Sequence, residues 1–226
     1  MKLAIFDIDG TLTETNEVDD KCFVRAFAES HRISDIETDW TKYKHVTDSG
    51  ILSEIVEKRL KRAPVEKDFA AFKHCFVKNL KDFAGKDAKL FAEIPGAKIM
   101  LEKLRLEKDW AICLATGSFY DSAALKLGAA KMNIEDFPIA TADDAVSREE
   151  ILQIAIEKSL NYYRQNEFEK IVSIGDGVWD VRTAKNLNLE FIGIAGERAD
   201  QLRREGAEFL IEDFSDYKVF LEYLNK

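Results

Sequence analysis

The chain has 226 residues, of which 46% are hydrophobic and 33% charged, a composition typical of a folded globular protein rather than a disordered or collagen-like one. Acidic residues outnumber basic residues by 42 to 33, and the resulting formal charge of −9 argues against nucleic acid as a partner. The longest unbroken apolar run, 110–115, is too short to span a bilayer, so we expect no membrane association.

The three cysteines show no C-x-x-C spacing and lie in apolar surroundings, so we interpret them as reduced thiols. The first residues, MKLAIFDIDG, contain no apolar stretch long enough for a secretory signal. These two observations lead us to expect a cytoplasmic protein, which would be a monomer or a homodimer.

Short apolar runs alternate with helical patterns over most of the chain, which predicts a doubly wound parallel sheet covered by helices. In chain order, we expect strands at 2–8, 110–116, 137–142, 170–176, 191–196 and 209–212. The intervening helices are expected at 97–108, 119–127, 148–160, 179–187 and 198–205, with a last helix closing the chain.

Residues 16–90 differ from the rest because their apolar residues recur at helical spacing. The clearest example is an aromatic stripe, which predicts core packing rather than a cofactor site: Phe69, Phe72, Phe76, Leu80 and Phe83. An all-helical segment cannot belong to the sheet. The predicted fold class is therefore α/β, with a Rossmann-like core formed by 1–15 and 91–226 and an α-helical domain inserted at 16–90.

Polar residues follow three of the predicted strands, where open parallel sheets bind ligands. The first strand ends in Asp7 and Asp9, which an extended chain would point to the same side. Another strand ends at 116–118, and a third ends in the sequence GDGVWD at 175–180. Clustered carboxylates repel one another unless a cation holds them, and an all-oxygen set without His or Cys suits Mg²⁺.

The sequence resembles the haloacid dehalogenase (HAD) superfamily, in particular its phosphoglycolate-phosphatase-like members, over nearly the whole chain. The resemblance is carried by DIDGT at 7–11, LATGS at 114–118, Arg148 before a helix, and GDGVWD at 175–180. The helical insertion resembles the first type of cap domain in that superfamily. It implies a Mg²⁺-dependent phosphatase that hydrolyses a small phosphorylated metabolite through an aspartyl-phosphate.

The resemblance also implies roles for individual residues. Asp7 matches the nucleophile and Asp9 the general acid and base, and an acid at the second position favours phosphate esters over dehalogenation. Thr116, with Gly117 and Ser118, matches the motif that holds the transferring phosphoryl group.

The superfamily usually places a lysine in its third motif, whereas this chain offers Arg148 at a helix start or Lys158 deeper in that helix. We choose Arg148. The implied metal ligands are Asp7, Asp9 through its backbone carbonyl, and Asp176, with Asp180 holding metal-bound water.

A polar segment of the insertion, His45, Thr47 and Asp48, is our candidate for contacting the leaving group. Two other functions stay open. A sugar phosphomutase would use the same first step but pass the phosphoryl group to a sugar. A degenerate, non-catalytic binding module is disfavoured by the intact motifs.

Overall fold

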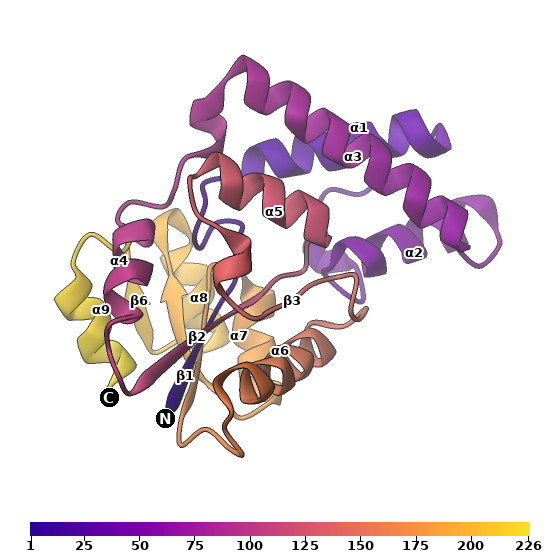
Figure 1. Cartoon of the computed structure of the whole chain (residues 1–226). Helices are drawn as coiled ribbons and strands as arrows, with labels where there is room; N and C mark the ends of the chain where they lie inside the picture. Colours follow the sequence, from indigo (N-terminus) through magenta and orange to yellow (C-terminus); the bar gives the residue numbers. More distant parts are fainter.

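The computed structural model describes residues 1–226, apart from the side chain of Glu197. Six parallel strands form one sheet in the order β3-β2-β1-β4-β5-β6, so the first strand of the chain lies at its centre (Figure 1). The strands are β1 (Lys2–Phe6), β2 (Trp110–Ala115), β3 (Ile139–Ala140), β4 (Ile171–Gly175), β5 (Glu190–Ile194) and β6 (Phe209–Ile211). The predicted α/β fold class is confirmed.

Both faces of β1 are apolar, because the sheet is covered by helices on both sides. Ala4 and Phe6 pack toward α4 (Ala97–Leu104), α5 (Tyr120–Ala129) and α9 (Tyr217–Leu224). Leu3 and Ile5 pack on the opposite face, toward α6 (Arg148–Tyr163). Helices α7 (Val178–Asn186) and α8 (Ala199–Glu205) continue that second layer along the sheet.

The remaining helices form what we call the helical unit, residues 16–91, which lies over one end of the sheet (Figure 1). It contains α1 (Asn16–His31), α2 (Asp48–Leu60) and α3 (Glu66–Lys86), followed by a 3₁₀ turn at Ala88–Phe91. The helices share a hydrophobic cluster in which Phe72 and Phe76 are completely buried, and this cluster also includes Phe119 and Ala142 of the core. The aromatic stripe of α3 therefore packs the helical unit, as its spacing predicts.

Element boundaries differ from the sequence prediction by a few residues. Helix α4 ends at Leu104 rather than near 108, because residues 105–107 form turns that bond back to 101–104. Strand β3 is only Ile139–Ala140, at the edge of the sheet, where it has a single neighbour. Such shifts are expected where local pattern alone defines an end.

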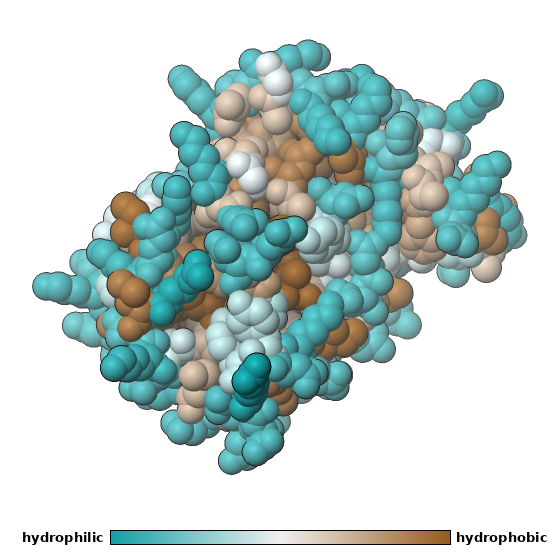
Figure 2. All heavy atoms as spheres, viewed as in Figure 1, coloured by the Kyte–Doolittle hydropathy of each residue, from teal (hydrophilic) through white to brown (hydrophobic). Residues whose placement is uncertain are grey.

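The surface is dominated by hydrophilic side chains, with smaller apolar areas between them on the face shown in Figure 2. Among the described residues, no helix combines the length and the apolar character needed to cross a membrane. Cys22 and Cys113 are buried and Cys75 is half-buried, and all three are free thiols.

Candidate active site

The carboxyl ends of β1, β2 and β4 open into a cleft between the sheet and the helical unit. The carboxyl ends of neighbouring parallel strands lie at the same end of the sheet, so residues distant in sequence meet there. The sheet side of the cleft is lined by Asp7, Asp9, Thr116, Gly117, Ser118, Arg148, Trp179 and Arg198. The helical unit contributes Asn16, Asp19, Asp20, Phe23, Trp40, Val46, Thr47, Asp48 and Ile51.

Three buried acids meet at the end of β1. Asp7, Asp176 and Asp180 each offer a carboxylate oxygen, and these oxygens lie within 4.8 Å of one another. Asp180 is in the first turn of α7, where it also accepts a hydrogen bond from the backbone N–H of Gly177 at 3.0 Å. Asp7 Oδ1 is buried and has no hydrogen-bond donor in the described structure.

The electrostatics of this cluster are unfavourable for three ionised acids. Burial, followed by the nearby charge of Asp180, raises the pKa of Asp7 to about 8. Burial also raises the pKa of Asp176 to about 7 and that of Asp180 to about 6, although nearby arginines oppose both changes. Burial and mutual repulsion therefore disfavour three ionised carboxylates at this site when no cation is bound.

Arg148 is the cation closest to Asp7. Its Nη1 lies 2.6 Å from Asp180 Oδ1 and 3.6 Å from Asp7 Oδ1, and its Nε donates to the carbonyl of Val46 at 2.9 Å. Lys158 instead donates to Asp144 and to the carbonyl of Ile139, away from the acids. Of the two alternatives for the third motif, the structure places Arg148 at the cluster.

Asp176 has two partners that the sequence analysis did not single out. Arg198 donates to Asp176 Oδ2 at 2.7 Å, and Asn16 of α1 donates to the same oxygen at 2.9 Å. The backbone of Gly10 lies against the Asp176 carboxylate and has a positive φ of 73°. A Cβ at this position would clash with that carboxylate. A glycine after the D-x-D pair is thus required both by the backbone conformation and by the space.

The three acids fit a hard divalent cation. All the candidate ligand atoms are carboxylate oxygens, and one of them, Asp7 Oδ1, is buried and receives no hydrogen bond in the described structure. Burial and the nearby acids raise the pKa values of all three carboxyl groups. Mg²⁺ prefers such carboxylate oxygens and keeps several waters in an octahedral shell. Asp7, Asp176 and Asp180 are the described acids whose oxygens come close enough together to hold such a cation.

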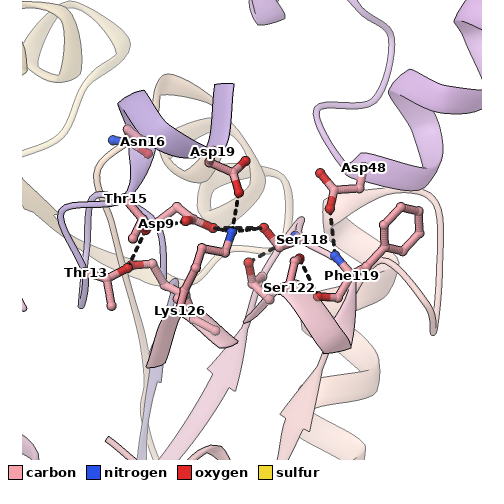
Figure 3. Close-up of polar contacts among 12 residues, drawn as sticks. Asp9, Thr13, Thr15, Asn16, Asp19, Asp48, Ser118, Phe119, Ser122 and Lys126 are labelled. Carbon is pink, nitrogen blue, oxygen red and sulfur yellow. Dashed lines mark hydrogen bonds and ion pairs between the residues drawn. The ribbon is translucent and has the colours of Figure 1, made fainter. Parts of the chain in front are cut away.

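Asp9 points into a different set of contacts, shown in Figure 3. Its Oδ2 accepts from Lys126 at 2.6 Å and from Ser118 at 2.8 Å, and its Oδ1 accepts from Thr15 at 2.5 Å. Burial acts to raise the pKa of Asp9, but Lys126 and these hydrogen bonds outweigh it and lower the pKa. Asp7 and Asp9 are both at the cleft, yet their carboxylates bind different partners.

Lys126 was missed by the sequence analysis, although a signal was present. It lies on α5 four residues after Ser122 and three after Ala123, and both of these residues are buried. A lysine on the buried face of a helix is unusual unless it is paired. Its side chain is completely buried, and it donates to Asp9, to Asp19 of α1 and to Ser118.

The loop after β2 brings Thr116 to the cleft, where its Oγ1 accepts from the backbone N–H of Ser118 at 3.1 Å. Gly117 is tightly packed, since a Cβ there would approach Arg148 and the carbonyl of Val46. This loop joins strand β2 to helix α5, and its backbone can therefore approach a bound anion closely.

The polar segment of the helical unit is docked onto the core. Thr47 caps α2 and donates to the carbonyl of Val146 at 2.7 Å, while Asp48 accepts from the backbone N–H of Phe119 at 2.8 Å. Both side chains are buried and line the cleft. His45 is half-buried and lies outside the described residues that line the cleft.

Comparisons with known proteins agree with this architecture. The family model for haloacid dehalogenase-like hydrolases matches residues 1–188. A hydrolase from Pseudomonas syringae shares 22% identity with a TM-score of 0.75, covering 98% of both chains. CbbY from Rhodobacter sphaeroides, solved with phosphate, shares 19% identity with a TM-score of 0.69 over 95% of both chains.

A predicted phosphoglycolate phosphatase from Haemophilus somnus shares 15% identity with a TM-score of 0.64, covering 98% of both chains. At these identities the solved structures establish the fold. No curated protein matches the chain. The family model spans most of the sequence, and the chain therefore belongs to the haloacid dehalogenase-like hydrolases. It is an enzyme of this hydrolase family.

Proposed function

We propose that this enzyme is a Mg²⁺-dependent phosphatase that hydrolyses a small phosphate monoester through an aspartyl-phosphate on Asp7. The observation that carries the proposal is the buried Asp7 carboxylate at the end of the central strand. One of its oxygens has no hydrogen-bond donor in the described structure, and two further acids and Arg148 surround it. Such an oxygen is available to a metal or to phosphorus.

In the proposed reaction, an oxygen of Asp7 attacks phosphorus while the bond to the leaving oxygen breaks. Protonated Asp9 gives its proton to that leaving oxygen, and the resulting carboxylate then takes a proton from the water that attacks the aspartyl-phosphate. Inorganic phosphate leaves, and the Asp7 carboxylate is restored. The Thr116 hydroxyl and the following backbone, together with Arg148, hold the phosphoryl group during both steps.

A bound Mg²⁺, held by Asp7, the Asp9 carbonyl and Asp176, would neutralise charge on the phosphoryl oxygens and on the nucleophile. Arg148 Nη1 forms its close ion pair with Asp180 Oδ1, at 2.6 Å. The guanidinium therefore lies beside Asp7 without forming an equally close pair with it. That arrangement leaves the cation able to face a phosphoryl oxygen.

We propose that residues 16–90 act as the cap and select the leaving group. Their side of the cleft carries Asp19, Asp20 and Asp48 beside two aromatic rings, Phe23 and Trp40. Among the described cleft-lining residues, the cations Arg148 and Arg198 both belong to the core. Because this side of the cleft offers carboxyl groups and, among the described residues that line it, no cation to bind a second phosphate, it favours a monophosphate with an uncharged or cationic leaving group over a sugar bisphosphate.

The decisive experiment is a panel of phosphorylated metabolites assayed for phosphate release with and without Mg²⁺. The panel should include matched sugar monophosphates and bisphosphates. Mg²⁺-dependent release from monophosphates supports the proposal, and the bisphosphates should be poorer substrates. Conversion of a sugar phosphate to its isomer without phosphate release would instead identify a phosphomutase, and no turnover of any ester would identify a binding module.

A further inference from the structure

Lys126 is a completely buried charged side chain that contacts three cleft-lining residues, Asp9, Asp19 and Ser118, and the reaction proposed above gives it no role. Its exposed fraction is 0%, whereas Asp9 and Asp19, its two acidic partners, keep 15% and 16%. A buried ammonium without partners is strongly unfavourable, so a lysine persists at such a site only where it is fully paired.

The contacts of Lys126 are complete. An ammonium has three hydrogens, and Nζ lies 2.6 Å from Asp9 Oδ2, 2.6 Å from Asp19 Oδ1 and 2.9 Å from Ser118 Oγ (Figure 3). These acceptors come from three different segments: the loop after β1, helix α1 and the loop after β2. Lys126 itself comes from a fourth segment, α5, so one side chain joins the core, the phosphate-binding loop and the helical unit.

Of the donors that hold Asp9, Lys126 is the only charged one among the described residues. Charge-assisted hydrogen bonds are shorter and stronger than neutral ones, so Lys126 dominates the orientation of the Asp9 carboxylate. Without it, Asp9 and Asp19 would face each other across the space now filled by the ammonium, and their repulsion would displace both.

We propose that Lys126 is a positioning residue that fixes the Asp9 carboxylate for proton transfer and couples its position to α1 of the helical unit. The inference rests on the proposed phosphatase function, because it assigns Lys126 to the group that protonates the leaving oxygen. It acts on Asp9 through geometry and charge, and it does not itself touch the phosphorus or the leaving oxygen.

The test uses two kinds of phosphate ester. An aryl ester such as p-nitrophenyl phosphate releases a stable anion and depends weakly on protonation of the leaving oxygen, whereas an alkyl ester such as glycerol phosphate depends on it strongly. General acid catalysis contributes about 10²- to 10⁴-fold. Both esters form the same aspartyl-phosphate, so the comparison uses kcat/KM, which reports only the steps up to its formation. We expect Lys126→Met to lower kcat/KM for the alkyl ester by about 100-fold and for the aryl ester by about 10-fold or less.

Loss of folding would lower both rates by the same factor, so the ratio of the two rates separates positioning from stability. Because Lys126→Met leaves two facing acids, the double variant Lys126→Met with Asp19→Asn removes one of those charges and protects the fold. It should show the same altered ratio. Asp19→Asn alone keeps the Lys126–Asp9 pair. Because Asp19 also lines the cleft, this variant is the reference against which the ratio of the double variant is read, so that the effect of Lys126 is separated from that of Asp19.

A matched control is Lys170→Met. Lys170 directly precedes β4, at the end of the sheet that lies opposite the cleft. Its ammonium pairs with Glu190 at 2.7 Å, and its side chain is 15% exposed. That variant should retain both rates. An unchanged ratio of alkyl to aryl rates in the single and double Lys126 variants would overturn the inference. An inactive wild type would instead remove the proposed function and the inference together.

Discussion

Replacing Asp7 with asparagine should abolish turnover and, in metal-free protein, stabilise the fold. Asparagine cannot attack phosphorus, so kcat should fall by several orders of magnitude. Stability should rise because the substitution removes a buried carboxylate that repels Asp180 and has few hydrogen bonds. Loss of the nucleophile and gain of stability are thus expected from the same change.

The magnitude follows from the pKa of Asp7, which burial raises from 3.8 to about 8. The folded state then holds a proton that the unfolded state has lost, so the contribution of Asp7 to stability is complete below about pH 4 and is lost as the pH rises toward about 8. At about pH 7 the accumulated loss is at most about 4 kcal/mol. Arg148 loses a neighbour in the variant, so we expect a net gain of about 2 kcal/mol, or about 4–8 °C in Tm.

The assay is thermal unfolding in a chelator across this pH range, with Asp109→Asn as the control. Asp109 is an exposed acid just before β2, at the end of the sheet that lies opposite the cleft. The stability of the Asp7 variant should depend less on pH than that of the wild type, and added Mg²⁺ should stabilise the wild type more. The reasoning is refuted if the variant is no more stable than the wild type, or if it keeps more than about a tenth of the activity.

Three further changes test separate parts of the molecule. Mg²⁺ should be required and Ca²⁺ should inhibit, because the larger ion accepts more ligands and can bind both Asp7 oxygens; full activity after exhaustive chelation would contradict this. Phe76→Ala should cost about 3–5 kcal/mol in denaturant unfolding, since the ring is completely buried and packs 5.5 Å from Phe23, whereas Leu106→Ala, at an 80% exposed site, should cost little. Thr47→Val should lower stability by about 1 kcal/mol, because its hydroxyl caps α2 and bonds to the core, and it should alter substrate preference; an unchanged substrate profile would show that Thr47 does not contribute to specificity.

The sequence predicts the fold well because each strand of the sheet is a short apolar run followed by a helical pattern. The edge at which Asp7, Thr116 and Asp176 meet follows from parallel topology, which makes that part of the candidate site predictable as well. Local pattern could not reveal that Asp7 and Asp9 have separate partners. Strand β1 ends at Phe6, and the alternation of an extended chain does not continue through the tight loop at Gly10.

Contacts between distant segments account for the other residues that the sequence analysis missed. Asn16 and Arg198 meet at Asp176 from opposite ends of the chain, and neither belongs to a motif. Lys126 shares a face of α5 with Ser122 and Ala123, which was the available signal, but its pairing with Asp9 and Asp19 depends on contacts between distant segments. The roles of the site residues and the division into cap and core stay predictions for the experiments above.

The central position of β1 has a consequence for biosynthesis. Leu3 pairs with Ala111 on one side and with Ile171 on the other, so the strand that leads to Asp7 is translated long before either neighbour exists. While the ribosome is still making the intervening residues, this apolar strand has exposed edges and needs protection from aggregation. The helical unit can pack meanwhile through its local contacts. Asp7 therefore reaches the environment described above only after β4 has been synthesised, and a nascent chain that stops earlier lacks the complete candidate site.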